Sequence, residues 1–149
     1  MKTLFVVLLP MFLPAMIQRP LKNGTPALSQ KTFLNSDVPL QGTRWQLIEL
    51  SGKTIPPDAT AKKMYLMLKS DSTVNGNGGC NTFSGNYSLG KDNQISFGEM
   101  VRTNVLCSGV NYEKDYLNAL AKADHYNING DTLILKNELV NLLKFTAGK

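Results

Sequence analysis

The chain has 149 residues, of which 42% are hydrophobic and 18% are charged, and its formal net charge is +5. This length suits one domain with a sizeable core and is too short for two ordinary domains. Two cysteines and one histidine do not reach the four ligands of a usual zinc site, and the scattered cations lack the clustering of a nucleic-acid binder. We therefore expect no metal, no cofactor and no nucleic-acid partner.

The N-terminus has the features of an export signal. Lys2 precedes an apolar run at residues 4–17, which is interrupted by Pro10 and Pro14. A membrane-spanning helix needs about 20 apolar residues, and this run is shorter. We expect residues 1–17 to be a secretory signal peptide, with an uncleaved N-terminal membrane anchor as the alternative. No cysteine lies nearby, so we expect a periplasmic or outer-envelope protein that is not lipid-anchored through cysteine.

Residues 18–40 are typical of a linker. They contain three prolines among polar residues and show neither helical nor strand periodicity. We expect the folded domain to occupy residues 41–149.

Strand signals dominate this domain. Short apolar or alternating runs predict strands at residues 44–50, 64–69, 85–89, 94–98, 100–106, 125–128, 132–136 and 139–145. One segment, residues 111–124, has helical spacing, with Asn111 as the expected N-cap. Its expected apolar face comprises Tyr116, Leu117, Leu120 and Ala121. The predicted fold is mainly β, of the α+β class: an antiparallel curled sheet, barrel-like, with one packed helix.

Two glycine-containing segments resemble nucleotide-binding loops only in part. Residues 85–91 match the first seven positions of a phosphate-binding loop, but Asp92 replaces its Ser or Thr, so we expect a hairpin turn at residues 90–93. Gly76 and Gly78 fail the dinucleotide-binding pattern because Asn81 stands at the third glycine position. We expect residues 75–79 to break the sheet.

His125 is the only imidazole and the one candidate for a general base. Ser84 or Cys80 could approach it in the fold as a nucleophile, whereas the adjacent Asp124 is not expected to orient it. Glu113 and Asp115 are two residues apart on the helix and point in different directions. We expect His125 to be structural and the protein to have no catalytic residue.

Cys80 and Cys107 are the candidate disulfide pair. Export to an oxidising compartment would favour their bond, while two buried free thiols and a reactive thiol are the alternatives. Four asparagines crowd the same region: Asn75, Asn77, Asn81 and Asn86. Asparagines in turns usually bond to their own backbone, so a local role is expected, with a polar binding rim as the alternative.

The run at residues 79–87, Gly-Cys-Asn-Thr-Phe-Ser-Gly-Asn-Tyr, resembles the signature of the META/HslJ domain family. Further blocks are similar in the same order, at residues 40–47, 95–107, 113–120 and 126–135. The resemblance implies a small antiparallel β-domain with a packed helix, often in exported envelope proteins linked to heat shock, drug tolerance and virulence. Both cysteines match family positions, which favours their pairing. The family supplies no reaction, cofactor or established ligand.

Three functions are consistent with these features. The leading hypothesis is a non-catalytic envelope domain that acts through contacts with an envelope protein, with possible membrane association through the N-terminus. The second is a module that binds a small apolar ligand or lipid inside the curled sheet. The third, a hydrolase using Ser84 or Cys80 with His125, is the least favoured because one histidine must serve the whole site.

Overall fold

The computed structural model describes residues 36–60, 62–108 and 112–148. The predicted signal peptide or anchor at residues 1–17, and most of the predicted linker at 18–40, lie outside the described residues. Near the end of that linker, Val38 and Leu40 pack against the core, and the Val38 amide donates to the Gly130 carbonyl at 2.9 Å. No helix in the described ranges is long and apolar enough to cross a membrane.

Ten strands and one helix make up the described part of the domain. They are β1 (Arg44–Leu50), β2 (Lys53–Thr54), β3 (Tyr65–Leu68), β4 (Thr73–Asn77), β5 (Thr82–Leu89), β6 (Ile95–Phe97), β7 (Val101–Arg102), α1 (Glu113–Lys122), β8 (His125–Asn129), β9 (Thr132–Asn137) and β10 (Val140–Ala147). The strands pair antiparallel in the order β6-β5-β4-β3-β1-β10-β9-β8, with β2 beside β1 and β7 beside β5.

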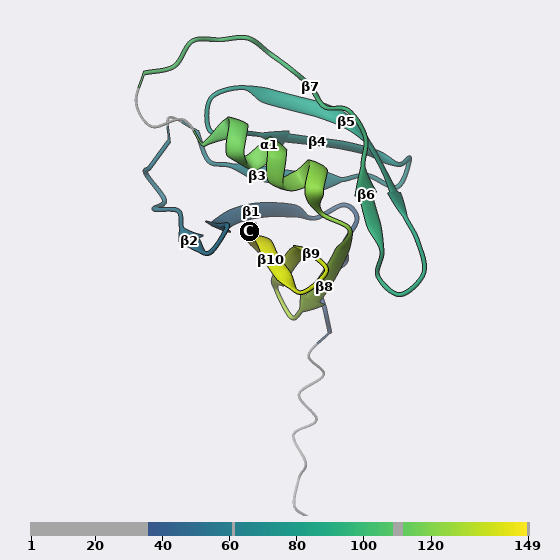
Figure 1. Ribbon diagram of the computed structural model, residues 1–149. Helices are drawn as coiled ribbons and strands as arrows, with labels where there is room; N and C mark the ends of the chain where they lie inside the picture. Colours follow the sequence, from purple (N-terminus) through teal and green to yellow (C-terminus); the bar gives the residue numbers. More distant parts are fainter. Residues whose placement is uncertain (1–35, 61, 109–111, 149) are drawn as a thin grey trace, which may run out of the picture. The chain divides into compact units, whose positions relative to one another are not determined.

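The two ends of this sheet meet. A bridge between Gln94 and His125 joins the start of β6 to β8, and the Ile95 amide donates to the Asp124 carbonyl at 2.9 Å. The sheet is therefore nearly closed into a barrel with α1 across its interior, which confirms the predicted fold class (Figure 1).

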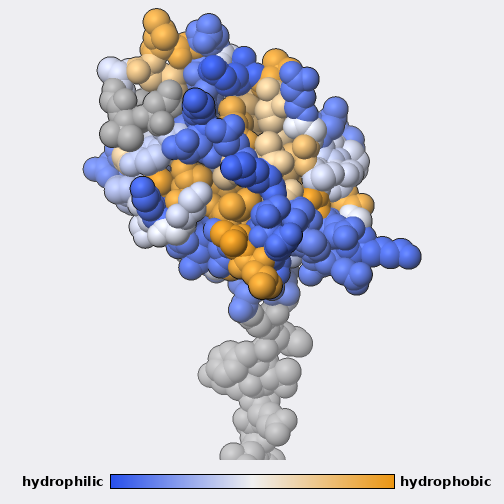
Figure 2. All heavy atoms as spheres, viewed as in Figure 1, coloured by the Kyte–Doolittle hydropathy of each residue, from blue (hydrophilic) through white to orange (hydrophobic). Residues whose placement is uncertain are grey.

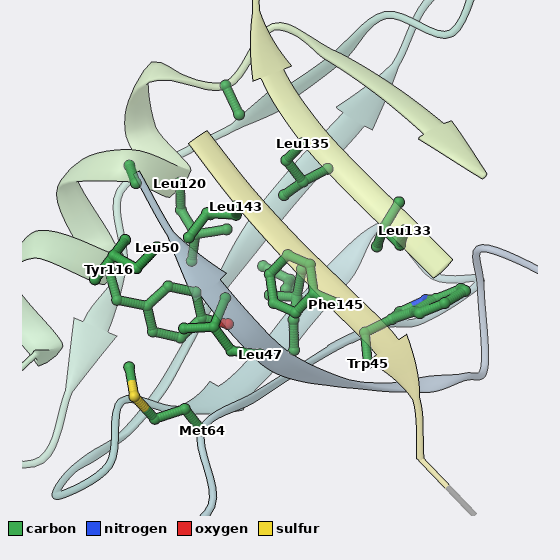
Figure 3. Close-up of a cluster of buried hydrophobic side chains, with 14 of the residues drawn as sticks. Trp45, Leu47, Leu50, Met64, Tyr116, Leu120, Leu133, Leu135, Leu143 and Phe145 are labelled. Atoms are coloured by element: carbon green, nitrogen blue, oxygen red, sulfur yellow. The ribbon is translucent and has the colours of Figure 1, made fainter. Parts of the chain in front are cut away.

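Large apolar side chains fill the interior. Trp45, Tyr116 and Phe145 are fully buried, and the Tyr116 ring packs edge-on against Phe83 at a centroid distance of 5.6 Å. Around them lie leucines from three strands and α1 (Figure 3): Leu47, Leu50, Leu120, Leu133, Leu135 and Leu143. Side chains thus occupy the space in which the second hypothesis placed an apolar ligand.

The predicted hairpin turn at residues 90–93 is confirmed, and a second hairpin joins the two strands predicted at residues 125–128 and 132–136. The phosphate-loop-like segment is the hairpin between β5 and β6, where Asp92 and Asn93 both have positive φ. The β8–β9 hairpin turns at Gly130, which has a φ of 61°. Asparagine, aspartate and glycine tolerate this left-handed conformation better than other residues, so these turns were readable from local sequence.

The predicted break at residues 75–79 is wrong in its first half. Residues 75–77 complete β4, and the chain turns only after Asn77. Gly76 belongs to the strand because a Cβ there would overlap the Phe83 ring and the Tyr65 carbonyl oxygen. The glycine therefore makes room for a core aromatic residue instead of ending the strand.

The helix also differs from its prediction in detail. Asn111, the expected N-cap, lies outside the described residues; Tyr112 is the N-cap and makes no side-chain capping bond. The buried face contains Ala119 in place of Ala121, which is exposed, and it begins with Glu113. The predicted strand at residues 100–106 is shorter as well, because only Val101–Arg102 pairs with β5.

Candidate functional site

Residues 101–108, which we call the arm, form an exposed segment that begins with β7. All eight residues are exposed, and three of them are large and apolar: Val101 is 71% exposed, Val105 59% and Leu106 96%. The arm runs along the upper edge of the domain in Figure 1, and apolar atoms stand out along that edge in Figure 2. Exposed apolar side chains grouped on one segment are typical of an interaction site.

Hydrogen bonds hold the backbone of the arm in place. Arg102 lies opposite Phe83 in the β7–β5 register, and the Thr103 amide donates to the Thr82 carbonyl at 3.0 Å. Beyond β7, the Asn81 side chain takes the place of a neighbouring strand. Its Oδ1 accepts from the Val105 amide at 2.7 Å, and its Nδ2 donates to the Val105 carbonyl at 3.2 Å.

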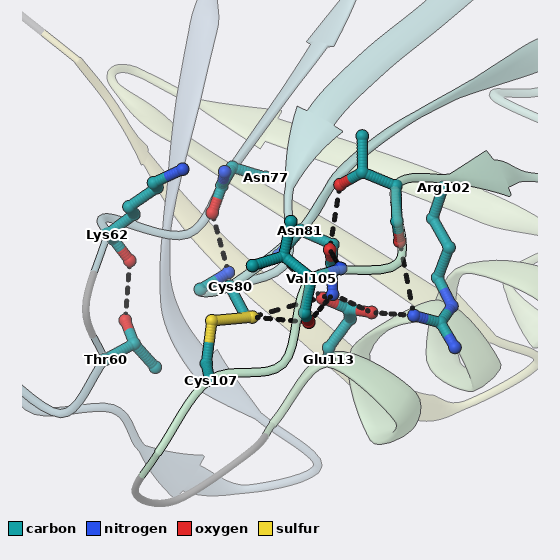
Figure 4. The surroundings of a disulfide bond; sticks show 11 residues. Thr60, Lys62, Asn77, Cys80, Asn81, Arg102, Val105, Cys107 and Glu113 are labelled. Atoms are coloured by element: carbon teal, nitrogen blue, oxygen red, sulfur yellow. Dashed lines mark hydrogen bonds and ion pairs between the residues drawn. A yellow bond between two sulfur atoms is a disulfide. The ribbon is translucent and has the colours of Figure 1, made fainter.

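A buried carboxylate ties this asparagine to the helix. Glu113, the first residue of α1, is 3% exposed. Its Oε2 accepts from the Asn81 amide at 2.9 Å, and its Oε1 accepts from Asn81 Nδ2 at 3.3 Å and from Arg102 Nη1 at 2.9 Å (Figure 4). The side chain needs the space above Gly78, where a Cβ would lie 2.6 Å from Glu113 Cγ. One carboxylate thus links the helix, the β4–β5 connection and the arm.

A disulfide closes the far end of the arm. Cys80 and Cys107 are bonded, with their Cα atoms 6.0 Å apart, so neither residue offers a free thiol in this structure. Cys80 is buried, whereas Cys107 is exposed at the end of the arm. We call Asn81, Arg102, Glu113 and this disulfide the clasp.

The local role predicted for the asparagines holds for only one of the two that are buried. Asn77 Oδ1 accepts from the Gly79 amide at 2.8 Å, which is a local turn bond. Asn81 instead bonds to residues 24 and 32 positions away in the chain. The burial of Glu113 could have been predicted from the sequence, because this residue precedes Tyr116 by three positions and therefore lies on the buried face of the helix.

His125 has the partner that the sequence analysis did not expect. Its Nδ1 lies 2.8 Å from Asp124 Oδ1, and the Asp124 carboxylate also accepts from the Glu138 amide at 3.1 Å and from Asn137 Nδ2 at 3.1 Å. The hydrogen bond with His125 is the main cause of the lowered pKa of Asp124. Asp124 can reach its neighbour because it lies at the bend between α1 and β8, where adjacent side chains need not point to opposite faces.

Neither predicted nucleophile accompanies His125. Cys80 is bonded to Cys107, and Ser84 lies opposite Asn75 and Val101 in the sheet. His125 lines an open hollow of about 390 Å³ with two other serines, Ser88 and Ser96, whose hydroxyl oxygens are 2.8 Å apart.

A groove along one side of α1 has the size to accept a small molecule. It has a volume of about 320 Å³ and runs between the helix and the end of β1. Leu50, Ile55 and Ala119 contribute apolar surface, while Lys53 and Lys122 also line it. It lies outside the filled interior of the sheet.

These features define a small antiparallel β-domain that encloses one helix and carries a clasped, apolar arm. The META domain family profile matches residues 38–149, and the chain belongs to this family, as the resemblance of residues 79–87 indicated. A protein from Burkholderia xenovorans, solved by NMR, is similar over 74% of this chain and 84% of its own, with 26% identity and a TM-score of 0.61.

A second NMR structure shares the fold at 17% identity and a TM-score of 0.57, covering 73% of this chain and 94% of its own. The search of curated proteins found no match.

Proposed function

We propose that this META domain is exported to the cell envelope and acts there by binding another protein through the arm, with no reaction of its own. The observation that carries the proposal is the arm itself: three large apolar side chains on one exposed segment whose backbone is held by partly buried hydrogen bonds and a disulfide. A segment fixed in advance loses less conformational entropy on binding than a flexible one.

Two features support the proposed location. The N-terminal sequence combines a positive start with a short apolar run, as secretory signals do. A disulfide is compatible with an oxidising compartment, where such bonds persist. The family resemblance adds the expectation that the bound protein takes part in tolerance of heat or drugs.

The proposed location is tested by the intact mass of the protein from its native cell fraction, measured before and after reduction and thiol alkylation. We expect a chain shortened at its N-terminus, with two thiols that react only after reduction. A full-length chain with two free thiols would overturn export.

The proposed contact is tested by a photo-crosslinking residue placed in cells at position 106 or at position 139. Leu106 and Leu139 are matched, because both are leucines that are at least 95% exposed. We expect a discrete protein adduct from position 106, identified by mass spectrometry, and none of the same mass from position 139. Equal yields from the two positions, or none from position 106, would contradict a role for the arm.

The groove beside α1 favours a second candidate function, the binding of a small amphipathic molecule. Apolar groups of Leu50 and Ile55 would contact its apolar part, and Lys53 or Lys122 would attract an anionic head. Native mass spectrometry of gently purified protein should then reveal a bound small molecule, and Asn118→Trp, at an exposed position that lines the groove, should remove it. A bare protein mass and no thermal shift with fatty acids or detergents would exclude this function.

A further inference from the structure

The outer edge of the arm has the geometry of an unprotected sheet edge. Thr103 and Val105 direct their backbone groups inward, to Thr82 and to the Asn81 side chain. Successive residues of an extended chain alternate in this direction, so the backbone N–H and C=O groups of Arg102 and Asn104 face away from the sheet. In the part of the chain that the structure describes, these outward groups have no hydrogen-bond partner.

Sheet edges of this kind are normally blocked against further pairing. Proteins use charged side chains, proline, bulges or covering segments for this purpose. The arm, Val-Arg-Thr-Asn-Val-Leu-Cys-Ser, contains no proline, and Arg102 is its only charged residue. The Arg102 guanidinium is already paired with Glu113 at 2.9 Å. The edge is therefore open to another strand, and its apolar side chains favour one.

We propose that the outer edge of the arm binds an extended, largely uncharged segment of another protein as an additional β-strand. The inference rests on the proposed function and specifies how the partner is recognised. Main-chain hydrogen bonds to Arg102 and Asn104 provide the register, and the exposed side chains of Val101, Val105 and Leu106 contact alternate side chains of the added strand.

A second copy of this chain fits the edge less well than a different protein. In the two-fold register that pairs the outward backbone groups of Arg102 with those of Asn104 in the other copy, the two Arg102 side chains lie on the same face as diagonal neighbours. Like charges at that spacing disfavour the pairing. A partner strand without a cation at that position avoids the repulsion.

The decisive experiment removes one outward amide and leaves the inward bonds intact. Asn104→Pro deletes the N–H at that position, and the matched control Asn104→Ala deletes only the side chain. Each is combined with the photo-crosslinking residue at position 106, and adduct yield is measured in intact cells. We expect Asn104→Pro to lower the yield about tenfold, the effect of losing one hydrogen bond and stranding its acceptor, while Asn104→Ala leaves it nearly unchanged.

Folding is checked by disulfide formation and thermal unfolding. If Asn104→Pro does not fold, the adducts from positions 104 and 106 are mapped on the partner in the otherwise unchanged protein. Strand addition requires attachment sites about two residues apart in one extended segment. Scattered attachment sites, or equal yields from folded Asn104→Pro and Asn104→Ala, would overturn strand addition while leaving the proposed function intact.

Two other outcomes separate the remaining possibilities. An adduct between two copies of this chain, abolished by Asn104→Pro, would show self-pairing and overturn the proposal of a different partner. The absence of any adduct from position 106 would remove the proposed function itself, and the inference with it.

Discussion

This domain exposes two pairs of adjacent apolar residues, each made of one valine and one leucine. The two pairs are exposed for different structural reasons. Val105 and Leu106 lie in the arm, and Leu139 and Val140, which are 95% and 62% exposed, lie at the turn between β9 and β10. Leu139 is exposed because a two-residue turn must place its tip in solvent. The arm has no such constraint, and it is held outward by the clasp.

We call the residue that holds each segment its anchor: Glu113 for the arm and Asp124 for the β9–β10 turn. The two anchors differ in the same way as the segments. Glu113 is at the start of α1 and is buried within the clasp, whereas Asp124 follows the helix and holds the β9–β10 turn with a side chain that is 41% exposed. An exposed apolar side chain therefore indicates a functional surface more strongly when buried interactions hold it in the exposed position. The turn needs no such support, and this contrast favours the arm as the functional segment.

Two parts of the clasp, the buried anchor Glu113 and the disulfide, are expected to matter most. Glu113→Ala should lower the free energy of unfolding by about 3 kcal/mol, because it leaves the buried backbone amide of Asn81 without its acceptor and removes the carboxylate that pairs with Arg102. Urea unfolding at neutral pH measures this loss. Lys114→Ala, at the exposed neighbouring position, is the control and should change stability by less than about 0.5 kcal/mol. Similar losses in both variants would show that the clasp is not a stabilising unit.

The disulfide is expected to have a comparable effect. Replacing Cys80 and Cys107 by alanine reopens a loop with a sequence separation of 27. The chain-entropy relation predicts a loss of about 3.5 kcal/mol. The wild-type protein, unfolded in excess reductant, should have the same unfolding midpoint as the double variant. A midpoint that reduction does not change would mean that hydrogen bonds alone hold the arm.

A buried hydroxyl near the clasp offers a gain in stability. Tyr116 lies three residues after Glu113 on the same helix face, and its hydroxyl is buried without a partner in the described part of the chain. Burial raises the pKa of this group well above its ordinary value of 10.0. Tyr116→Phe should therefore stabilise the domain by about 1 kcal/mol in thermal or urea unfolding. A clear loss would indicate that the hydroxyl bonds to ordered water.

The exposed anchor is expected to have the smallest effect, confined to acid pH. The pKa of Asp124 is below its usual 3.8, chiefly through the hydrogen bond with His125, so its ionised form favours the folded state. This contribution is complete above the unfolded-state pKa and disappears as pH falls through the lowered folded-state pKa. Unfolding midpoints of Asp124→Asn and wild type should thus differ at neutral pH and converge as the pH falls well below 3.8. A difference in midpoint that stays the same at every pH would show that the shape of the Asp124 side chain, and not its charge, stabilises the fold.

Much of the architecture follows from local sequence. Strand alternation in residues 44–50, the turn at Asn129-Gly130 and the helical spacing around Tyr116 each depend on residues close together in the chain. The family resemblance rested on similarly compact blocks, above all residues 79–87. These features identified the fold class, the order of the elements and the family.

The functional region depended on contacts that sequence neighbours do not encode. The burial of Glu113, the strand-like role of the Asn81 side chain and the place of Gly76 inside β4 were settled by residues up to 32 positions away in the chain. Periodicity and turn preference describe how a segment folds, but a hydrogen bond also requires that two distant groups meet at the right distance and angle. The sequence by itself therefore determined the sheet and its helix, and only the tertiary structure decided that residues 103–106 lie along the edge of the sheet with their side chains exposed.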